Sequence, residues 1–168
     1  MILAIDPSNK EHTAYCVIDE KTYKPIDFGM CGPEEMIRIL DSCNSGLIKD
    51  KYKINHVAIE MVASYGMPVG RDVFETCIFI GRMLEHIKKD NYTYIYRKEV
   101  KINLCGRTSG ANDTTVRKAL IDRFAKFDFR SGKGTKKNPD FFYGFKADVW
   151  ASYAVGVTYL DKTNCYDF

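Results

Sequence analysis

Short apolar runs and polar, turn-forming segments alternate along the first third of the chain. Residues 2–6 and 13–18 have the composition of strands, and the segment between them is dense in turn formers, which predicts an antiparallel hairpin. A third strand near 24–31 would complete a meander. The continuous apolar run within residues 55–60 is typical of a buried parallel strand, and a fifth strand is predicted at 92–96.

Helical periodicity follows in four segments. Pro33 opens a helix whose apolar positions reach Leu47, since proline suits the first helical turn. The strongest pattern lies at about 72–89, where apolar residues recur at steps of three and four over an arc wider than one sheet face requires. Further helices are predicted from Thr114, a plausible N-cap, and from about 147 to 161. The apolar residues of the 72–89 segment are Val73, Phe74, Cys77, Ile78, Phe79, Ile80, Leu84 and Ile87.

This order of elements predicts a single α/β domain spanning residues 1–168, with a five-stranded mixed sheet flanked by helices. A chain of 168 residues with 45% hydrophobic composition can form one domain with a substantial core. The net charge of +3 is only mildly basic, so any nucleic-acid surface must be a local patch. We expect a cytoplasmic location, because there is no basic-plus-apolar leader and no apolar run approaching about 18 residues. The six cysteines contain no C-x-x-C pair and are typical of reduced core thiols rather than of a structural zinc site.

Three carboxylates stand where apolar runs begin or end. Asp6 and Glu60 each follow a predicted strand, and Asp148 precedes the last predicted helix. Taken singly, Asp6 fits a turn, Glu60 a solvated side chain and Asp148 a helix N-cap. Taken together, acids at the ends of two strands and the start of a helix can converge, and convergent oxygen ligands are what Mg²⁺ or Mn²⁺ requires. A pair of such ions drives phosphodiester hydrolysis, so the pattern indicates a metal-dependent nuclease.

Four segments, in this order along nearly the whole chain, resemble the RuvC-type Holliday-junction resolvases of the ribonuclease H-like superfamily. The segments are Ile2-Leu-Ala-Ile-Asp-Pro-Ser8 with Thr13-Ala-Tyr15, Val57-Ala-Ile-Glu60, Val100-Lys101 with Gly106, Ala111 and Val116, and Ala147-Asp-Val-Trp-Ala151. The stretch from Ser64 through Arg82 also looks like small resolvase-like proteins carried by bacteriophages. For such a protein the expected location is the cytoplasm of a bacterial host.

The resemblance implies a ribonuclease H-like fold and an endonuclease that nicks four-way junctions and other branched DNA. Asp6, Glu60 and Asp148 would hold two Mg²⁺ ions about 4 Å apart, with Mn²⁺ able to substitute. One ion would activate a water for in-line attack and the other would stabilise the departing 3′ oxygen, leaving a 5′ phosphate. Lys101 would stabilise charge on the reacting phosphate or orient the water, with Lys98 as the neighbouring alternative.

Two positions depart from the family pattern. The family usually has a fourth metal ligand three residues before the last Asp, where this chain has Phe145; Asp140 lies nearby but out of register. The family also often places a junction-wedging aromatic three residues after the second acid. That position is Ala63 here, and Tyr65 is a possible substitute.

Further DNA contacts are predicted in the basic, glycine-containing tract 130–139, from Lys133, Lys136 and Lys137, with Arg107 extending the same surface. Such a tract is equally often a solvated loop. The wide apolar arc of the 72–89 helix, with Ile80 as the residue on which association depends, predicts a homodimer that presents two sites to the two strands of a junction.

Three rival functions remain at the level of sequence. A ribonuclease H-like nuclease acting on flaps or RNA–DNA hybrids would share the three acids. A non-catalytic junction-binding protein is made plausible by Phe145. An actin-like kinase also begins with a strand ending in Asp, but it needs two such domains, for which this chain is too short.

Overall fold

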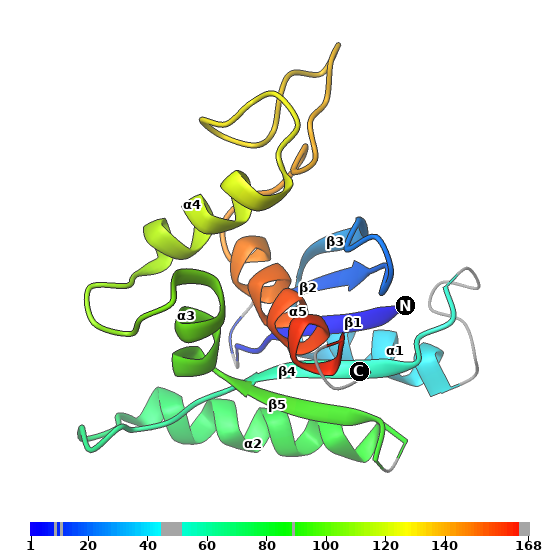
Figure 1. The fold of residues 1–168 in the computed structure, drawn as a ribbon. Helices are drawn as coiled ribbons and strands as arrows, with labels where there is room; N and C mark the ends of the chain where they lie inside the picture. Colours follow the sequence, from blue (N-terminus) through cyan, green and yellow to red (C-terminus); the bar gives the residue numbers. More distant parts are fainter. Residues whose placement is uncertain (9, 11, 45–51, 89, 165–168) are drawn as a thin grey trace.

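The computed structural model describes residues 1–8, 10, 12–44, 52–88 and 90–164. At its centre is a five-stranded sheet in the order β3-β2-β1-β4-β5, with helices on both faces (Figure 1). The strands are β1 (Ile2–Asp6), β2 (Thr13–Ile18), β3 (Pro25–Cys31), β4 (His56–Met61) and β5 (Tyr92–Tyr96). The helices are α1 (Pro33–Asn44), α2 (Arg71–Glu85), α3 (Arg97–Cys105), α4 (Asp113–Phe124) and α5 (Val149–Asn164).

The sheet is mixed, as the sequence predicts. Strand β2 pairs antiparallel with both β1 and β3, which confirms the hairpin and the meander. Strand β4 pairs parallel with β1, and β5 pairs parallel with β4. The register sets Ile5 of β1 opposite Ile59 of β4, so the next residues, Asp6 and Glu60, lie at the carboxyl ends of neighbouring strands, at the same edge of the sheet.

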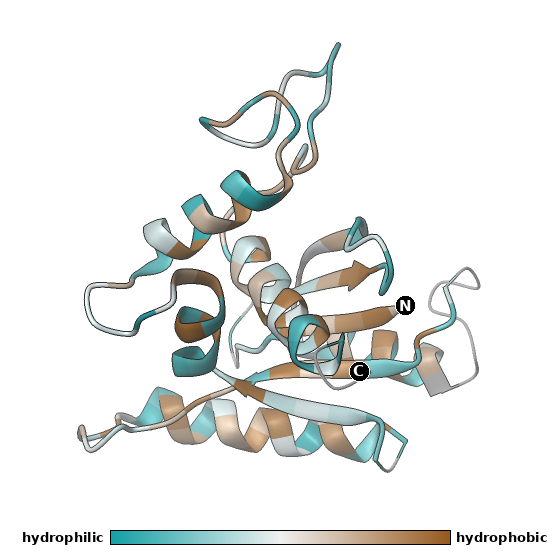
Figure 2. Cartoon of the chain, viewed as in Figure 1, coloured by the Kyte–Doolittle hydropathy of each residue, from teal (hydrophilic) through white to brown (hydrophobic). Residues whose placement is uncertain are grey.

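Alternation along the strands divides the core between the two faces of the sheet. Leu3 and Ile5 belong to the cluster that α1 and α2 cover. Ile2, Ala4 and Ala58 belong to the cluster that α5 covers, together with parts of α3 and α4. In Figure 2 strand β1 is apolar along most of its length, as expected for a central strand packed on both sides. Because side chains alternate with a period of two, the carboxyl ends of β1 and β4 direct their acids to the α5 face.

Helix α5 lies unusually close to the sheet at Gly156. A β-carbon at this position would come within 2.3 Å of Ile18 Cδ1 and 2.9 Å of Ala4 Cβ, so only glycine permits this approach. Toward the carboxyl end of the helix, the Tyr159 ring stacks on His56, at the start of β4, with ring centroids 4.5 Å apart. The helix therefore runs antiparallel to β4, and its first turn lies over the carboxyl ends of β1 and β4.

Several element boundaries differ from the sequence prediction. Helix α2 ends at Glu85, short of the predicted limit near 89, and α5 begins at Val149 rather than 147. The N-cap of α4 is Asn112, whose Oδ1 accepts a hydrogen bond from Thr115 N, and not Thr114. Leu47, predicted to belong to the first helix, lies outside the described residues.

Helix α3 and the orientation of α2 are the larger differences. The sequence analysis missed α3, because it follows β5 without an intervening turn former and is only weakly amphipathic. Its first turn is held instead by Glu99, which accepts a hydrogen bond from Tyr96 N at 2.7 Å. The prediction that Ile80 mediates dimerisation is wrong, because Ile80 is 2% exposed and packs against the sheet. Within the described residues, no helix is both long and apolar enough to cross a membrane.

The Gly156 contact makes a testable prediction. Gly156→Ala should lower the free energy of unfolding by about 1–2 kcal/mol, because overpacking of about 1–3 kcal/mol exceeds the helix-propensity gain of up to about 1 kcal/mol. Urea unfolding followed by circular dichroism measures the change. Gly81→Ala is the matched control: Gly81 lies in α2, where an added β-carbon would meet nothing within 4 Å, so this change should stabilise the protein. Equal effects at both positions would contradict the close approach.

Candidate active site

Asp6 and Glu60 form a pair of acids at the edge of the sheet. Their carboxyl groups lie close enough to share a hydrogen bond when one of them is protonated. Burial, followed by the negative charges of Glu60 and Asp148, raises the pKa of Asp6 to about 8. Burial also raises the pKa of Glu60. Two acids held this close in a partly desolvated site resist full ionisation unless a positive charge joins them.

Asp148 approaches this pair from the start of helix α5, which covers this face of the sheet. It is exposed, it directly precedes α5, and its carbonyl oxygen accepts a hydrogen bond from Ser152 N at 3.0 Å. The preceding residue, Ala147, has a left-handed backbone with φ of 42°, which sharply redirects the chain as it enters the helix. The Asp148 carboxylate is near enough to Asp6 to raise its pKa, so it faces the same edge of the sheet as the acid pair, although the described residues contain no tight group of three acids.

Arg97 is the residue of this site that the sequence analysis missed. It is the first residue of α3, and its positive charge lowers the pKa of both Asp6 and Glu60. It also forms an ion pair with Asp113, while its Nη1 atom is buried without a hydrogen-bond partner among the described residues. The signal was available: Arg97 directly follows β5, which runs parallel to β4, so it ends at the same edge as Glu60.

The donor chemistry of the acids fits a hard divalent cation. Carboxylate oxygens are the preferred ligands of Mg²⁺ and Mn²⁺, and a cation would relieve the repulsion that raises the pKa of Asp6. As the side chains stand, no three His, Cys, Asp or Glu residues of the described ranges are grouped tightly enough to enclose an ion. Asp6 and Glu60 are thus the pair of carboxylates at this edge that could hold a cation, and Asp148 lies within electrostatic range of the pair.

Neither position considered for a fourth metal ligand, 145 or 140, can supply one. Phe145 is 1% exposed and packs edge-on against Phe142, Trp150 and Tyr153. Asp140 accepts hydrogen bonds from the backbone N–H groups of residues 126, 127, 128 and 141. Phe145 therefore belongs to the aromatic core, and the Asp140 carboxylate is committed to the backbone.

A hollow of about 280 Å³ that Arg97 shares brings together three other predicted residues. It is lined by Tyr65, Arg97, Lys98, Lys101 and Thr108. The Tyr65 side chain is 57% exposed, and its hydroxyl accepts a hydrogen bond from Lys98 N at 3.3 Å. Lys101 therefore lies next to Arg97, and Tyr65 stands at the rim of the site.

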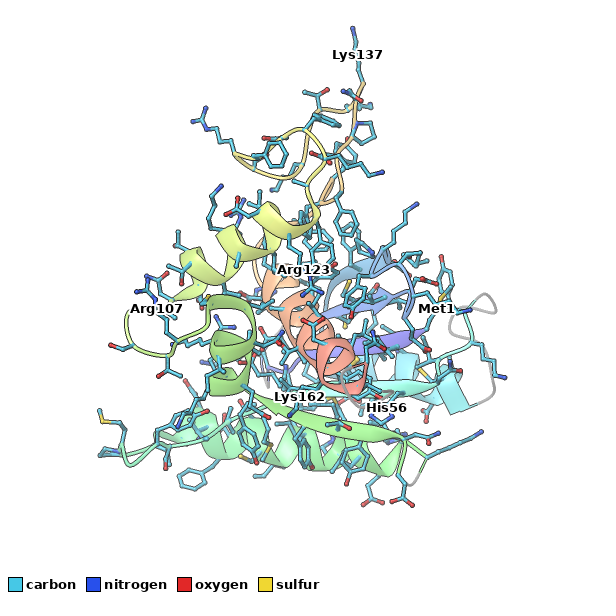
Figure 3. The ribbon with its side chains drawn as sticks, viewed as in Figure 1. Met1, His56, Arg107, Arg123, Lys137 and Lys162 are labelled. Atoms are coloured by element: carbon cyan, nitrogen blue, oxygen red, sulfur yellow. The ribbon has the colours of Figure 1, made fainter. Side chains whose placement is uncertain are left out.

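The remaining predicted DNA-contacting residues lie elsewhere. Lys133, Lys136 and Lys137 belong to the segment 125–143, which projects beyond α4, and Figure 3 places Lys137 at its outer tip. Arg107 lies on the loop between α3 and α4, well separated from Lys137 in the same view. The structure therefore does not join Arg107 and the three lysines into one patch.

The basic segment is an ordered turn rather than the flexible loop that its glycines indicate. The Asp128 carboxylate accepts hydrogen bonds from the N–H groups of Ser131 and Gly134. The Asp140 carboxylate accepts hydrogen bonds from the backbone segment that follows α4. Gly134 has φ of 65°, and a β-carbon there would meet Asn138 O at 2.4 Å. The two carboxylates thus fix the position from which the lysines extend.

Comparisons with known proteins identify the fold. No protein-family model matches the sequence, and no curated protein matches it either. Among solved structures the chain is similar to T. thermophilus RuvC in complex with Holliday junction substrate, at 12% identity and a TM-score of 0.67, covering 98% of this chain and 94% of that one. A second structure of Thermus thermophilus RuvC gives 12% identity and a TM-score of 0.59, over 98% and 95% of the two chains. The predicted ribonuclease H-like fold is confirmed; the bacteriophage-like assignment stays a prediction.

The Asp140 contacts predict a specific loss of stability in acid. Burial alone would raise the pKa of Asp140, but the hydrogen bonds that its carboxylate accepts from backbone N–H groups hold the pKa at about 2, below the ordinary 3.8. A depressed pKa stabilises the fold above pH 3.8, and that contribution is lost as the pH falls toward 2. Asp140→Asn should lower the free energy of unfolding at pH 7 by about 1.5–3 kcal/mol.

The measurement is urea unfolding at a series of pH values. Asp122→Asn is the matched control, because Asp122 is exposed and forms only an i,i+4 ion pair with Lys118. If Asp140→Asn were as stable as the control at pH 7, the carboxylate would not hold the segment in place.

Proposed function

We propose that this protein is a metal-dependent, structure-selective DNA endonuclease that nicks four-way junctions and other branched DNA. The observation that carries the proposal is the Asp6–Glu60 pair, with Asp148 in electrostatic range, at one edge of a ribonuclease H-like sheet. The neighbouring structure of T. thermophilus RuvC was determined in complex with Holliday junction substrate, which supports branched DNA as the substrate class.

The chain supplies distinct groups to this reaction. Asp6, Glu60 and Asp148 would hold two Mg²⁺ ions, or Mn²⁺ in their place, which activate a water and stabilise the leaving 3′ oxygen when bound. Lys101 and Arg97, which share one hollow, would place positive charge next to the reacting phosphate. Arg97 also favours the ionised forms of Asp6 and Glu60, the forms that bind a cation.

Two rival functions make different demands on the same site. A nuclease for flaps or RNA–DNA hybrids would use the same acids as a monomer. A non-catalytic junction-binding protein would have no use for two partly desolvated carboxylates whose repulsion destabilises the metal-free fold. The acid pair therefore favours catalysis over binding alone, and substrate choice is decided by assay on synthetic junctions, flaps and hybrids.

Amide substitution of the acids tests the proposed catalytic role. Asp6→Asn, Glu60→Gln and Asp148→Asn should each lower the rate of junction cleavage by about a hundredfold or more, because each removes a charge from the metal cage. Junction affinity, measured by gel shift, should stay close to that of the wild type. Mn²⁺ should raise the Tm of the wild type and not of Asp6→Asn, since a ligand that binds only the folded state stabilises it.

Glu85→Gln is the control for the loss of one carboxylate, because Glu85 is exposed at the end of α2. Near-full activity of any of the three variants would remove that residue from the site. Cleavage by all three would overturn the proposal.

Salt dependence tests the lysines of the projecting segment. If Lys133, Lys136 and Lys137 contact phosphates, replacing all three with Gln should reduce the slope of log affinity against log salt by about 2–3, because each contact releases about one counterion. The measurement is fluorescence anisotropy of a labelled four-way junction over a range of salt concentrations. An unchanged slope would show that the segment is solvated and does not contact DNA.

A matched triple variant replaces Lys21, Lys24 and Lys88 with Gln. These lysines are exposed near the amino ends of β1 and β5, the edge of the sheet opposite the acids. The control variant should keep the slope of the wild type.

We further propose that the protein acts as a homodimer through the outer face of α2. Phe74 and Ile78, one helical turn apart on this face, are 59% and 66% exposed, and Met67 in the preceding loop is 71% exposed. A second copy packing here would cover these side chains and give one active site for each of the two symmetry-related junction strands. This assignment replaces Ile80, which belongs to the core.

Ile78→Glu should therefore split the dimer without unfolding the protein, because Ile78 makes little contact with its own core. Sedimentation velocity of the wild type and the variant measures the change. Ile80→Glu is the contrasting control and should unfold the chain. A monomeric wild type at micromolar concentration, also when bound to a junction, would contradict the dimer and favour the flap or hybrid nuclease.

A further inference from the structure

A cavity of about 360 Å³ lies between α4 and the start of α5, outside the acid pair. Its lining includes Arg117 and Lys118 of α4, Arg130 of the projecting segment, and Trp150 of α5. A smaller hollow of about 60 Å³ shares Arg117 and Trp150 with this cavity and is also lined by Arg97 and Asp148. The cavity is therefore the neighbour of the active site along the first turn of α5.

The cavity has an excess of positive charge. Lys118 is neutralised by Asp122, with Nζ 2.7 Å from Oδ1, and Asp113 is engaged by Arg97. Arg117 and Arg130 form no ion pair with any acid in the described ranges, and they line the cavity together with Asp113, whose carboxylate is paired with Arg97. The Arg117 guanidinium lies over the Trp150 ring, 4.5 Å from its centroid, which holds it in a fixed orientation.

Two buried donors without partners mark the same place. Trp150 is 8% exposed, and its Nε1 has no hydrogen-bond partner among the described residues; the Nη1 atom of Arg97 is in the same state. Both residues line the smaller hollow that joins the cavity to Asp148. Buried polar groups are rarely left unpaired, and a missing acceptor is the usual explanation.

We propose that this cavity binds a backbone phosphate of the DNA strand, the phosphodiester that neighbours the one to be cut. The inference rests on the proposed nuclease function and extends it by naming where the adjoining nucleotide is held. An arginine fork pairs with phosphate oxygens in two parallel hydrogen bonds, and the oriented guanidinium of Arg117 is suited to this. Such a contact would fix the position of the scissile phosphate over Asp6, Glu60 and Asp148, which makes Arg117 a positioning residue and not a catalytic one.

A methylphosphonate scan tests the site without altering the protein. Four-way junctions are made with one neutral methylphosphonate at each phosphate around the cut position, and their affinities are measured in the cleavage-deficient Asp6→Asn background. A methylphosphonate at one flanking position should weaken junction binding by about tenfold, which is the loss expected for one charge-assisted contact. Adding Arg117→Gln should weaken the affinity for the unmodified junction about tenfold. In that variant, a methylphosphonate at the same flanking position should weaken the affinity no further. Arg38→Gln, on α1 at the opposite face of the sheet, should leave the scan unchanged.

Thermal unfolding shows whether Arg117→Gln is folded, and Arg117→Lys, which keeps the charge, should recover part of the affinity. With otherwise wild-type protein, Arg117→Gln should raise KM more than it lowers kcat. If the wild type binds and cuts junctions but every flanking methylphosphonate is tolerated, or the losses are additive with Arg117→Gln at every position, the phosphate site is wrong and the proposed function stands. If the wild type neither binds nor cuts branched DNA, the proposed function fails, and this inference fails with it.

Discussion

Helix α5 meets the sheet at a position where the helix has no side chain, since Gly156 faces Ala4 and the tip of Ile18. This contact fixes how close the helix lies and how far it can slide along β1. The antiparallel direction of the helix then places its first turn over the carboxyl ends of β1 and β4. Asp148 reaches Asp6 only because this packing holds, so the geometry of the acids depends on a contact several residues away from any of them.

The acid pair works against the stability of the fold that carries it. Burial and mutual repulsion raise the pKa of Asp6 to about 8, which is an unfavourable arrangement for a structural residue at neutral pH. Arg97 offsets part of the repulsion but is itself shared with Asp113. Strain of this kind is typical of functional sites, where a group is held ready for a charge that arrives with a ligand. The smaller hollow beside Asp148 is lined by two residues that each carry a buried donor without a partner among the described residues, Arg97 and Trp150.

The sheet and the position of Asp6 and Glu60 at its edge were predictable because each depends on a local pattern. Apolar runs of strand length, with acids directly after them, are visible in the sequence and become adjacent through parallel pairing. Arg97 was missed because its role depends on β5 lying next to β4, which no local pattern reveals. Ile80 was misassigned because periodicity identifies an apolar arc without showing which part of it the sheet covers. The commitment of Asp140 to backbone N–H groups depends on a turn whose shape sequence does not specify.

The likeness to RuvC extends over nearly the whole chain but rests on 12% identity, so it fixes the fold and leaves the chemistry to the residues themselves. One residue beside the site, Phe145, is part of the core and supplies no ligand. The proposed function therefore requires that Asp6, Glu60 and Asp148 suffice to hold the cations. An anomalous difference map from crystals grown with Mn²⁺ and a bound junction would locate the cations. Peaks should appear in contact with Asp6 and Glu60 and within reach of Asp148; a map with no peak at this edge of the sheet, or with Mn²⁺ bound only elsewhere, would show that these acids do not hold them.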